Sequence, residues 1–266
     1  MRTIRLVVEY DGTDFSGWQA QGDPAIRTVA GTIEGALETV LQERIGLGVA
    51  GRTDRGVHAR GNVASFTTAN PLPLWRIARA LAGMLPHDVA ARELAEVPET
   101  FHARFSAVER RYVYRLLDQP GALHARQAWW PWMRLDPEFL TEAFRPLLGE
   151  HEFRAFAGRD PSNQPPSHGR CRVTRLEFVP WSGGVQLEAH ANRFLYHMVR
   201  NLVGTATAIT KGTKRAGDLP AILASGDRRT AGPTSPPHGL TLEAVVYPER
   251  FAPVGDVVDG WGRSRT

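Results

Sequence analysis

The residues best suited to chemistry lie in one short segment, Ala50–Ala59, which reads Ala-Gly-Arg-Thr-Asp-Arg-Gly-Val-His-Ala. Its single acid, Asp54, stands between Arg52 and Arg55. Positively charged neighbours favour the ionised carboxylate, which can attack as a nucleophile or abstract a proton. The alternative is an aspartate that only organises its own turn, as Asp does in many loops.

The pattern of apolar residues predicts the elements that must hold this segment. In the N-terminal half it predicts, in order, a strand at 4–10, a helix at 29–41, strands near 47–50 and at 62–67, a helix at 74–85 and a strand at 89–97. Asp54 then lies between the second and third strands, in a connection longer than a tight hairpin needs. The order is βαββαβ.

The second half repeats this order. It predicts a strand at 110–117, a helix starting at Asp136-Pro137, a hairpin of 172–179 and 185–191, a helix at about 194–209 and a strand at 240–247. The split-βαβ order is typical of ferredoxin-like folds, so we predict an α+β chain of two such halves, residues 1–103 and 104–266. The alternative is that the repeated element order arose by chance, because α+β chains are common.

Composition narrows the class of protein. The chain is 42% hydrophobic and 23% charged, with one cysteine, so neither a disulfide framework nor a Cys-based metal cluster is possible. The absence of a long apolar run or a signal peptide predicts a cytoplasmic protein without a membrane span. Residues 158–230 hold 11 Lys and Arg against 5 Asp and Glu. This excess fits a polyanion-binding surface or simply a solvated basic face.

Several motifs together resemble one family. The segment Gly51–Ala59 resembles the active-site signature of the tRNA pseudouridine synthase A family. Five further segments resemble the family's other motifs in the same order; they are Tyr10–Gln19, Phe101–Ala107, Arg110–Tyr114, Ala191–Gly204 and Gly239–Leu242. One such motif would be weak evidence for the family. Six motifs in the same order, covering nearly the whole chain, argue strongly against a chance resemblance. Arg55 departs from the small residue common in bacterial members and could add a phosphate contact.

The resemblance implies a fold and an activity. The fold would be a pseudouridine-synthase core with a predominantly antiparallel sheet and an active-site cleft between the halves. The activity would be conversion of uridine to pseudouridine at tRNA positions 38, 39 and 40 by a homodimer. This isomerisation gains no electrons, water or group, so we predict no cofactor; the histidines also lack metal-ligand spacing, so we predict no metal.

The resemblance also assigns roles to five residues. Asp54 would start the reaction, and Arg200, in an otherwise apolar stretch, would pair with it. Tyr112 would stack on the uracil, although a strand tyrosine can equally be buried in the core. Leu240 would pack beneath the base. Arg52 would hold a phosphate or the loop, because a guanidinium donates two bonds in one plane.

Two other functions compete with this one. A tRNA-binding protein without catalysis would keep the basic surface and the aromatic residues, but Asp54 would then be dispensable. A glycosidase usually needs two carboxylates, and no second acid accompanies Asp54 in its motif.

Other features have open roles. The cluster Trp129-Trp130-Pro131-Trp132 is expected to pack in the core or against another subunit, with an RNA-stacking platform as the alternative. Phe15 and Trp18 could shape a loop that touches RNA. Irregular loops are expected at Gln19–Arg27 and Gly158–Gly169, and long loops often carry function.

Overall fold

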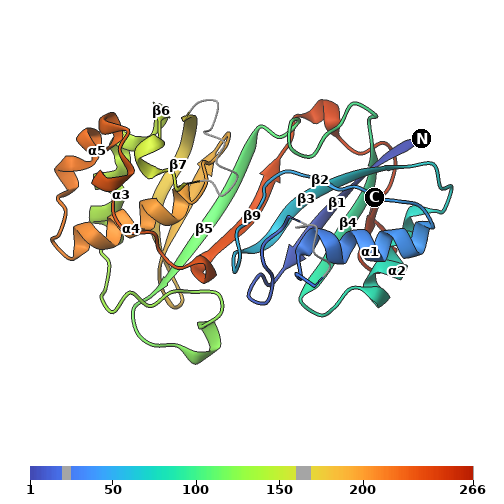
Figure 1. Cartoon of the computed structure of the whole chain (residues 1–266), viewed down its shortest axis with the longest axis horizontal. Coiled ribbons are helices and arrows are strands. Elements are labelled where there is room, and N and C mark those ends of the chain that lie inside the picture. Colours follow the sequence, from blue (N-terminus) through green and yellow to red (C-terminus); the bar gives the residue numbers. More distant parts are fainter. Residues whose placement is uncertain (20–24, 160–168, 266) are drawn as a thin grey trace. The chain divides into compact units, whose positions relative to one another are not determined.

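The computed structural model describes residues 1–19, 25–159 and 169–265 (Figure 1). The central parts of the two predicted irregular loops, 20–24 and 160–168, lie outside the described residues. The chain divides into two compact units, one formed by Met1–Val108 with Leu242–Thr266 and the other by Glu109–Thr241. This division differs from the predicted halves, because the C-terminal segment pairs with strands of the N-terminal unit.

The first unit is a sheet with two helices. Its elements are β1 (Arg2–Tyr10), α1 (Val29–Leu41), β2 (Gly48–Val49), β3 (His58–Thr68), α2 (Leu74–Met84), β4 (Val89–Val97), β9 (Leu240–Val246), β10 (Val257–Asp259) and β11 (Ser264–Arg265). The first two residues of β9, Leu240 and Thr241, belong to the second unit. The strand order is β11-β10-β4-β1-β3-β9, and β2 pairs with β3. The predicted helices and strands of residues 1–97 are confirmed, and β3 begins at His58 rather than near 62.

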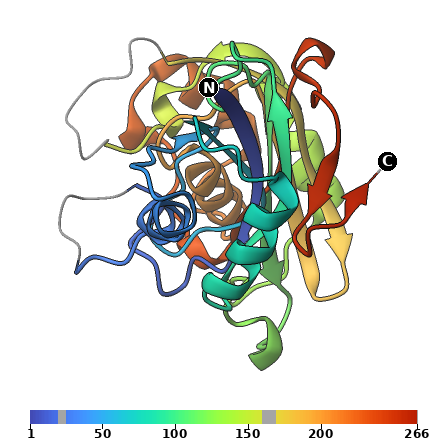
Figure 2. The same ribbon diagram turned by 90° about the vertical axis from the view of Figure 1, so that its right-hand side faces the viewer.

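The sequence pattern explains this packing. Alternate residues of β1, from Ile4 to Tyr10, are at most 3% exposed. In α1 the buried residues recur with helical spacing, and the Thr28 side chain caps the helix by accepting from the Gly31 N–H. Both helices lie on one face of the sheet (Figure 2). A smaller apolar cluster contains Ala50, Val63, Val97, Phe101 and Ala103.

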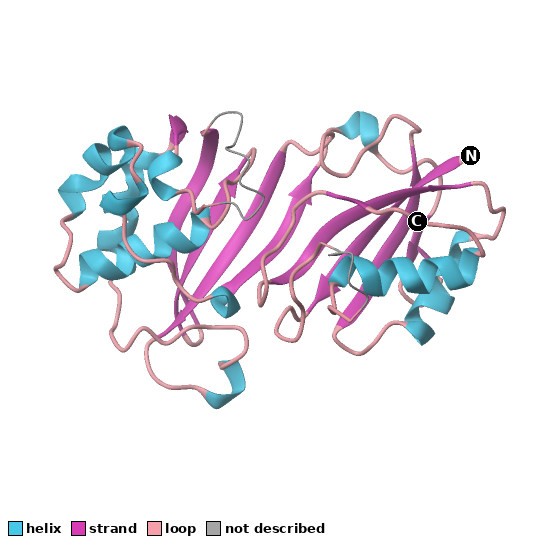
Figure 3. Cartoon of the chain, viewed as in Figure 1, coloured by secondary structure: helices cyan, strands magenta, loops and turns pink. Residues whose placement is uncertain are grey.

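The second unit is also α+β. Its elements are β5 (Glu109–Leu117), α3 (Pro137–Phe144), β6 (Gly149–Glu152), β7 (Arg170–Trp181), β8 (Gly184–Ala191), α4 (Met198–Thr210) and α5 (Leu219–Ser225). The strand order is β5-β8-β7-β6, with antiparallel pairs throughout. The chain is therefore a mixed α+β protein with mostly antiparallel strands (Figure 3).

Short 3₁₀ turns complete the described structure. They are η1 (Ala122–His124), η2 (Arg145–Leu147), η3 (Arg154–Phe156), η4 (Ala216–Asp218), η5 (Arg228–Thr230), η6 (Pro237–Gly239) and η7 (Glu249–Phe251).

The second unit confirms the predicted helix start and hairpin but corrects one helix. Asp136 caps α3 by accepting from the Phe139 N–H, with Pro137 in the first turn. The helix predicted from about 194 begins only at Met198, because His197 has a left-handed backbone with φ 59°. Among the residues the structure describes, none forms a helix long and apolar enough to cross a bilayer.

Candidate active site

Asp54 begins a tight turn in the connection between β2 and β3. The Val57 N–H donates to the Asp54 carbonyl at 3.1 Å, and Gly56 has φ 78°. A positive φ at the third position is the signature of a type II turn, which favours glycine there. Asp54 is half-buried, whereas Arg52 and Arg55 are exposed. The turn therefore holds the carboxylate partly covered between two solvent-facing cations.

A chain of buried hydrogen bonds holds the residue before Asp54. The Asn62 side-chain amide donates to the Tyr10 hydroxyl at 3.2 Å, and that hydroxyl lies 2.7 Å from the Thr53 hydroxyl. The same amide donates to the Gly51 carbonyl at 2.9 Å, and the Trp18 N–H donates to the Thr53 carbonyl at 3.0 Å. Burial raises the pKa of Tyr10, so its phenol stays protonated and can donate to Thr53. These contacts fix the loop on both sides of Thr53.

Two glycines allow the opening motif, Tyr10–Gln19, to lie against the loop that carries Asp54. A Cβ on Gly12 would lie 2.0 Å from the Val57 carbonyl oxygen, and one on Gly17 would lie 2.9 Å from the Thr53 carbonyl oxygen. The Gly12 N–H also donates to His58 Nδ1 at 3.1 Å, and His58 is 3% exposed. The Tyr10–Gln19 and Gly51–Ala59 motifs therefore pack against each other, and the Tyr10–Gln19 motif supports the loop that carries Asp54.

The aromatic residues of the opening motif have a structural place. Phe15 and Trp18 are each 1% exposed. Arg27 lies 4.0 Å from the Phe15 ring centroid and donates two 2.7 Å hydrogen bonds to Asp88, which lower the pKa of that carboxyl. Phe15 and Trp18 thus shape the segment from within the unit and present no surface for stacking.

The second unit carries the predicted tyrosine on β5. Tyr112 is 9% exposed, and its ring meets the Phe194 ring edge-to-face at 5.1 Å. Tyr114 is fully buried and donates its hydroxyl proton to the Pro236 carbonyl at 2.8 Å. A Cβ on Gly239 would lie 2.5 Å from the Tyr114 ring. Tyr114 is therefore a core residue, and Tyr112 is the more accessible of the two.

Arg200 is held by the segment that follows η5. Its Nε donates to the Ser235 carbonyl at 2.8 Å, and the Ser235 N–H donates back to the Arg200 carbonyl at 3.2 Å. Further along α4, the Gly232 N–H donates to the Thr205 hydroxyl at 2.8 Å. A Cβ on Gly204 would lie 1.6 Å from the Pro233 carbonyl oxygen. Contact between α4 and residues 232–235 thus fixes the direction of the Arg200 side chain.

A polar network beside Arg200 was not predicted from the sequence. Asn201 is fully buried; its amide donates to the Phe156 carbonyl at 2.7 Å, and its oxygen accepts from Arg228 at 2.8 Å and from Thr234 at 2.6 Å. Burial, with the guanidinium groups of Arg200 and Arg228, lowers the pKa of His197 to about 4. The signal for Asn201 was available, since a polar residue in an apolar helix stretch needs a partner.

The two remaining predicted site residues are Leu240 and Arg52. Leu240 is 6% exposed and begins β9. Arg52 makes no hydrogen bond or ion pair with another residue that the structure describes. The first unit therefore holds Arg52 and Asp54 on one loop, and the second unit holds Tyr112, Arg200 and Leu240.

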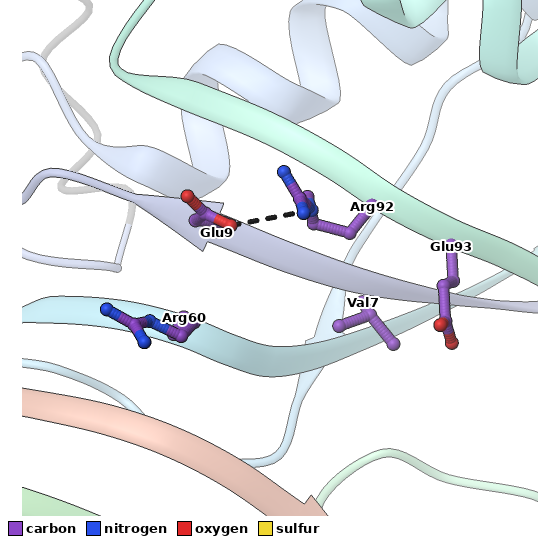
Figure 4. Close-up of a pocket in the computed structure, with 5 residues that line it drawn as sticks. All are labelled: Val7, Glu9, Arg60, Arg92 and Glu93. Atoms are coloured by element: carbon purple, nitrogen blue, oxygen red, sulfur yellow. Dashed lines mark ion pairs between the residues drawn. The ribbon is translucent and has the colours of Figure 1, made fainter. Parts of the chain in front are cut away.

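A separate depression of about 460 Å³ lies on the sheet of the first unit (Figure 4). It is lined by Val7, Glu9, Arg60, Arg92 and Glu93. The Arg92 and Glu9 side chains approach to 3.4 Å, and Arg60 lies 3.6 Å from Glu243. Its charges are paired and none of the predicted site residues lines it, so it gives no strong attraction for an anion.

Known proteins resemble the chain over most of its length. A family model described as tRNA pseudouridine synthase matches residues 6–106 and 143–248. A tRNA pseudouridine synthase A from Pelodictyon phaeoclathratiforme is 42% identical over 248 residues, covering 93% of this chain and 100% of the relative. One from Chloroflexus aurantiacus is 44% identical, covering 93% and 90%, and one from Dechloromonas aromatica is 40% identical, covering 97% and 98%. The chain belongs to the tRNA pseudouridine synthase family.

Proposed function

We propose that this protein is an isomerase that converts uridine to pseudouridine in tRNA. The observation that carries the proposal is family membership over nearly the whole chain. The resemblance of the Asp54 segment to the family's active-site signature supports it. The packed support of this loop by the opening motif agrees with a site whose geometry must be held.

We propose that side chains alone carry out the isomerisation of uridine. The N1–C1′ bond of uridine breaks, a C5–C1′ bond forms, the C5 proton leaves and N1 takes up a proton. We propose that Asp54 starts this sequence, either by covalent attack or by removing a sugar proton. The target base must first leave its stack. Isomerisation is redox-neutral, so the proposal includes no cofactor.

Four residues are proposed to assist Asp54. Arg200 pairs with the Asp54 carboxylate and keeps it ionised and oriented. The Tyr112 ring stacks on the flipped uracil, and Leu240 packs beneath it. Arg52 binds a phosphate; its exposure on the Asp54 loop supports this.

The finer architecture is also a proposal. We propose two ferredoxin-like halves with an active-site cleft between them. The βαββαβ element order of residues 2–97 and the strand order β4-β1-β3, with β2 beside β3, support this for the first half. A homodimer in the cytoplasm, acting on the anticodon stem-loop at positions 38, 39 and 40, completes the proposal, and its support is the resemblance of the motifs.

The test uses an unmodified tRNA transcript with uridine at all three positions. We expect the protein to form pseudouridine there without added metal or cofactor, as detected by nucleoside mass spectrometry after chemical labelling. Replacing each uridine by cytidine in turn locates the modified sites, and sedimentation gives the oligomeric state. A protein that binds these transcripts but modifies none would instead be a binding protein.

Arg52 gives a prediction about phosphate binding. We expect Arg52→Ala to weaken tRNA binding and to reduce the slope of log K against log salt by about 0.7 to 0.9, the value for one phosphate contact. Filter binding at several salt concentrations measures the slope. Arg79→Ala, which removes an exposed cation from α2, is the matched control. An unchanged slope in Arg52→Ala would remove this residue from the phosphate contacts.

A further inference from the structure

The loop between β5 and α3 presents an exposed pair of indole rings. It is the green loop at the foot of Figure 1. The ring centroids of Trp130 and Trp132 are 3.8 Å apart, with planes inclined by 31°. Trp132 is 79% exposed, so of the packing expected from the sequence, in the core or against another subunit, the core is wrong for this residue. One indole therefore lies against another and turns most of its surface to solvent.

The base of this loop is firmly anchored. The Trp129 N–H donates to the Arg115 carbonyl at 3.0 Å, and the Leu117 N–H donates to the Trp129 carbonyl at 2.8 Å. The Trp129 ring meets the buried Tyr114 ring edge-to-face at 6.4 Å. Pro131, which stands between Trp130 and Trp132 in the sequence, is buried. The indole pair thus stands on backbone fixed to β5 and is ordered before any partner binds.

The backbone at Trp132 is unusual. Its φ is 62°, in the left-handed region that a bulky side chain rarely adopts. Such a conformation persists only where its surroundings enforce it, and it is concentrated at functional positions. Here it holds a large apolar side chain in solvent, which gives no folding benefit and points to a ligand with a flat face.

The charge of the loop identifies that ligand as an RNA base rather than a second protein. The loop contains the exposed Arg126 and Arg134, and its two acids, Asp118 and Asp136, stand at its ends, where Asp136 caps α3. The large apolar side chains that the loop exposes strongly are Leu123 and Trp132. A stable protein interface needs roughly 800 Å² from each partner, contributed by about 20 residues. A single exposed ring two residues before the exposed guanidinium of Arg134 matches a stacked base with its phosphate.

We propose that Trp132, backed by Trp130, stacks on an unpaired base of tRNA while Arg134 binds a neighbouring phosphate. The tRNA identity of the ligand rests on the proposed function; the stacking platform rests on this loop. The platform contributes to binding and takes no part in bond breaking, because it is distinct from the residues proposed to act on uridine.

The test compares tRNA affinity and pseudouridine formation in three variants. We expect Trp132→Ala to raise the Kd for unmodified tRNA about 5- to 150-fold, the loss of one base–aromatic stack. Its single-turnover rate at saturating enzyme should stay close to wild type. Trp132→Phe should restore most of the affinity. Trp261→Ala is the matched control, because Trp261 is 77% exposed in a turn of the other unit.

The outcomes separate the possibilities. An unchanged Kd in Trp132→Ala overturns the platform. So does a loss of affinity that accompanies dissociation of an oligomer in sedimentation, since that result assigns Trp132 to a subunit interface. If wild type binds tRNA without forming pseudouridine and Trp132→Ala still weakens binding, the proposed function fails while the platform stands.

Discussion

Replacing Asp54 by Asn is expected to lower the rate of pseudouridine formation by at least about 1,000-fold, within the range that a single acid–base or nucleophilic group supplies. The amide has nearly the shape of the carboxylate but cannot attack C1′ or accept a sugar proton. The measurement is a single-turnover time course with enzyme in excess over tRNA. Because the substitution is nearly isosteric, tRNA affinity and thermal stability should change little.

The control for this prediction is Asp14→Asn, which removes an exposed carboxylate from the Tyr10–Gln19 motif. It should leave the rate near wild type. If Asp54→Asn retained more than a tenth of the wild-type rate, Asp54 would not be the group that starts the reaction. Equal losses in both variants would indicate a general charge effect.

Replacing Gly204 by Ala is expected to destabilise the second unit by about 3 kcal/mol or more, at the upper end of overpacking effects. The added Cβ would lie 1.6 Å from the Pro233 carbonyl oxygen and 2.7 Å from its carbon, both of them backbone atoms. Either α4 or residues 232–235 must move. Because Arg200 and Ser235 exchange two hydrogen bonds across this contact, their geometry should change as well.

Urea unfolding monitored by circular dichroism measures this loss, with Gly35→Ala as the matched helical control. Gly35 lies within α1 and has no atom within 4 Å of an added Cβ, so alanine should stabilise that helix by up to about 1 kcal/mol. A Gly204→Ala variant as stable as wild type would show that α4 and residues 232–235 are not in close contact.

Much of the fold was predictable because its signals are local. Alternation from Ile4 to Tyr10 reflects a strand with one buried face, and Asp136-Pro137 is a local start signal for α3. The strand β6 was missed because its sequence, Gly-Glu-His-Glu, has no apolar alternation; pairing with β7 alone makes it a strand. The membership of residues 242–265 in the first unit also depends on pairing between distant segments, which periodicity does not encode.

The candidate site was predictable to a different degree. The sequence located Asp54 between two cations in a connection between strands, and the turn at Gly56 agrees with that reading. The supports of the loop were not predictable. The Asn62–Tyr10–Thr53 chain and the close approach of Gly12 to Val57 join residues more than 40 positions apart, and only tertiary packing brings them together.

The most direct test of the account measures the fate of the uridine C5 hydrogen. In a tRNA transcript labelled with tritium at C5 of uridine, forming the C5–C1′ bond releases that tritium to solvent. We predict that the wild-type protein releases one equivalent for each pseudouridine formed, without added metal or cofactor, and that Asp54→Asn releases essentially none. Tight tRNA binding by the wild-type protein with no tritium release, or release of free labelled uracil, would contradict the account.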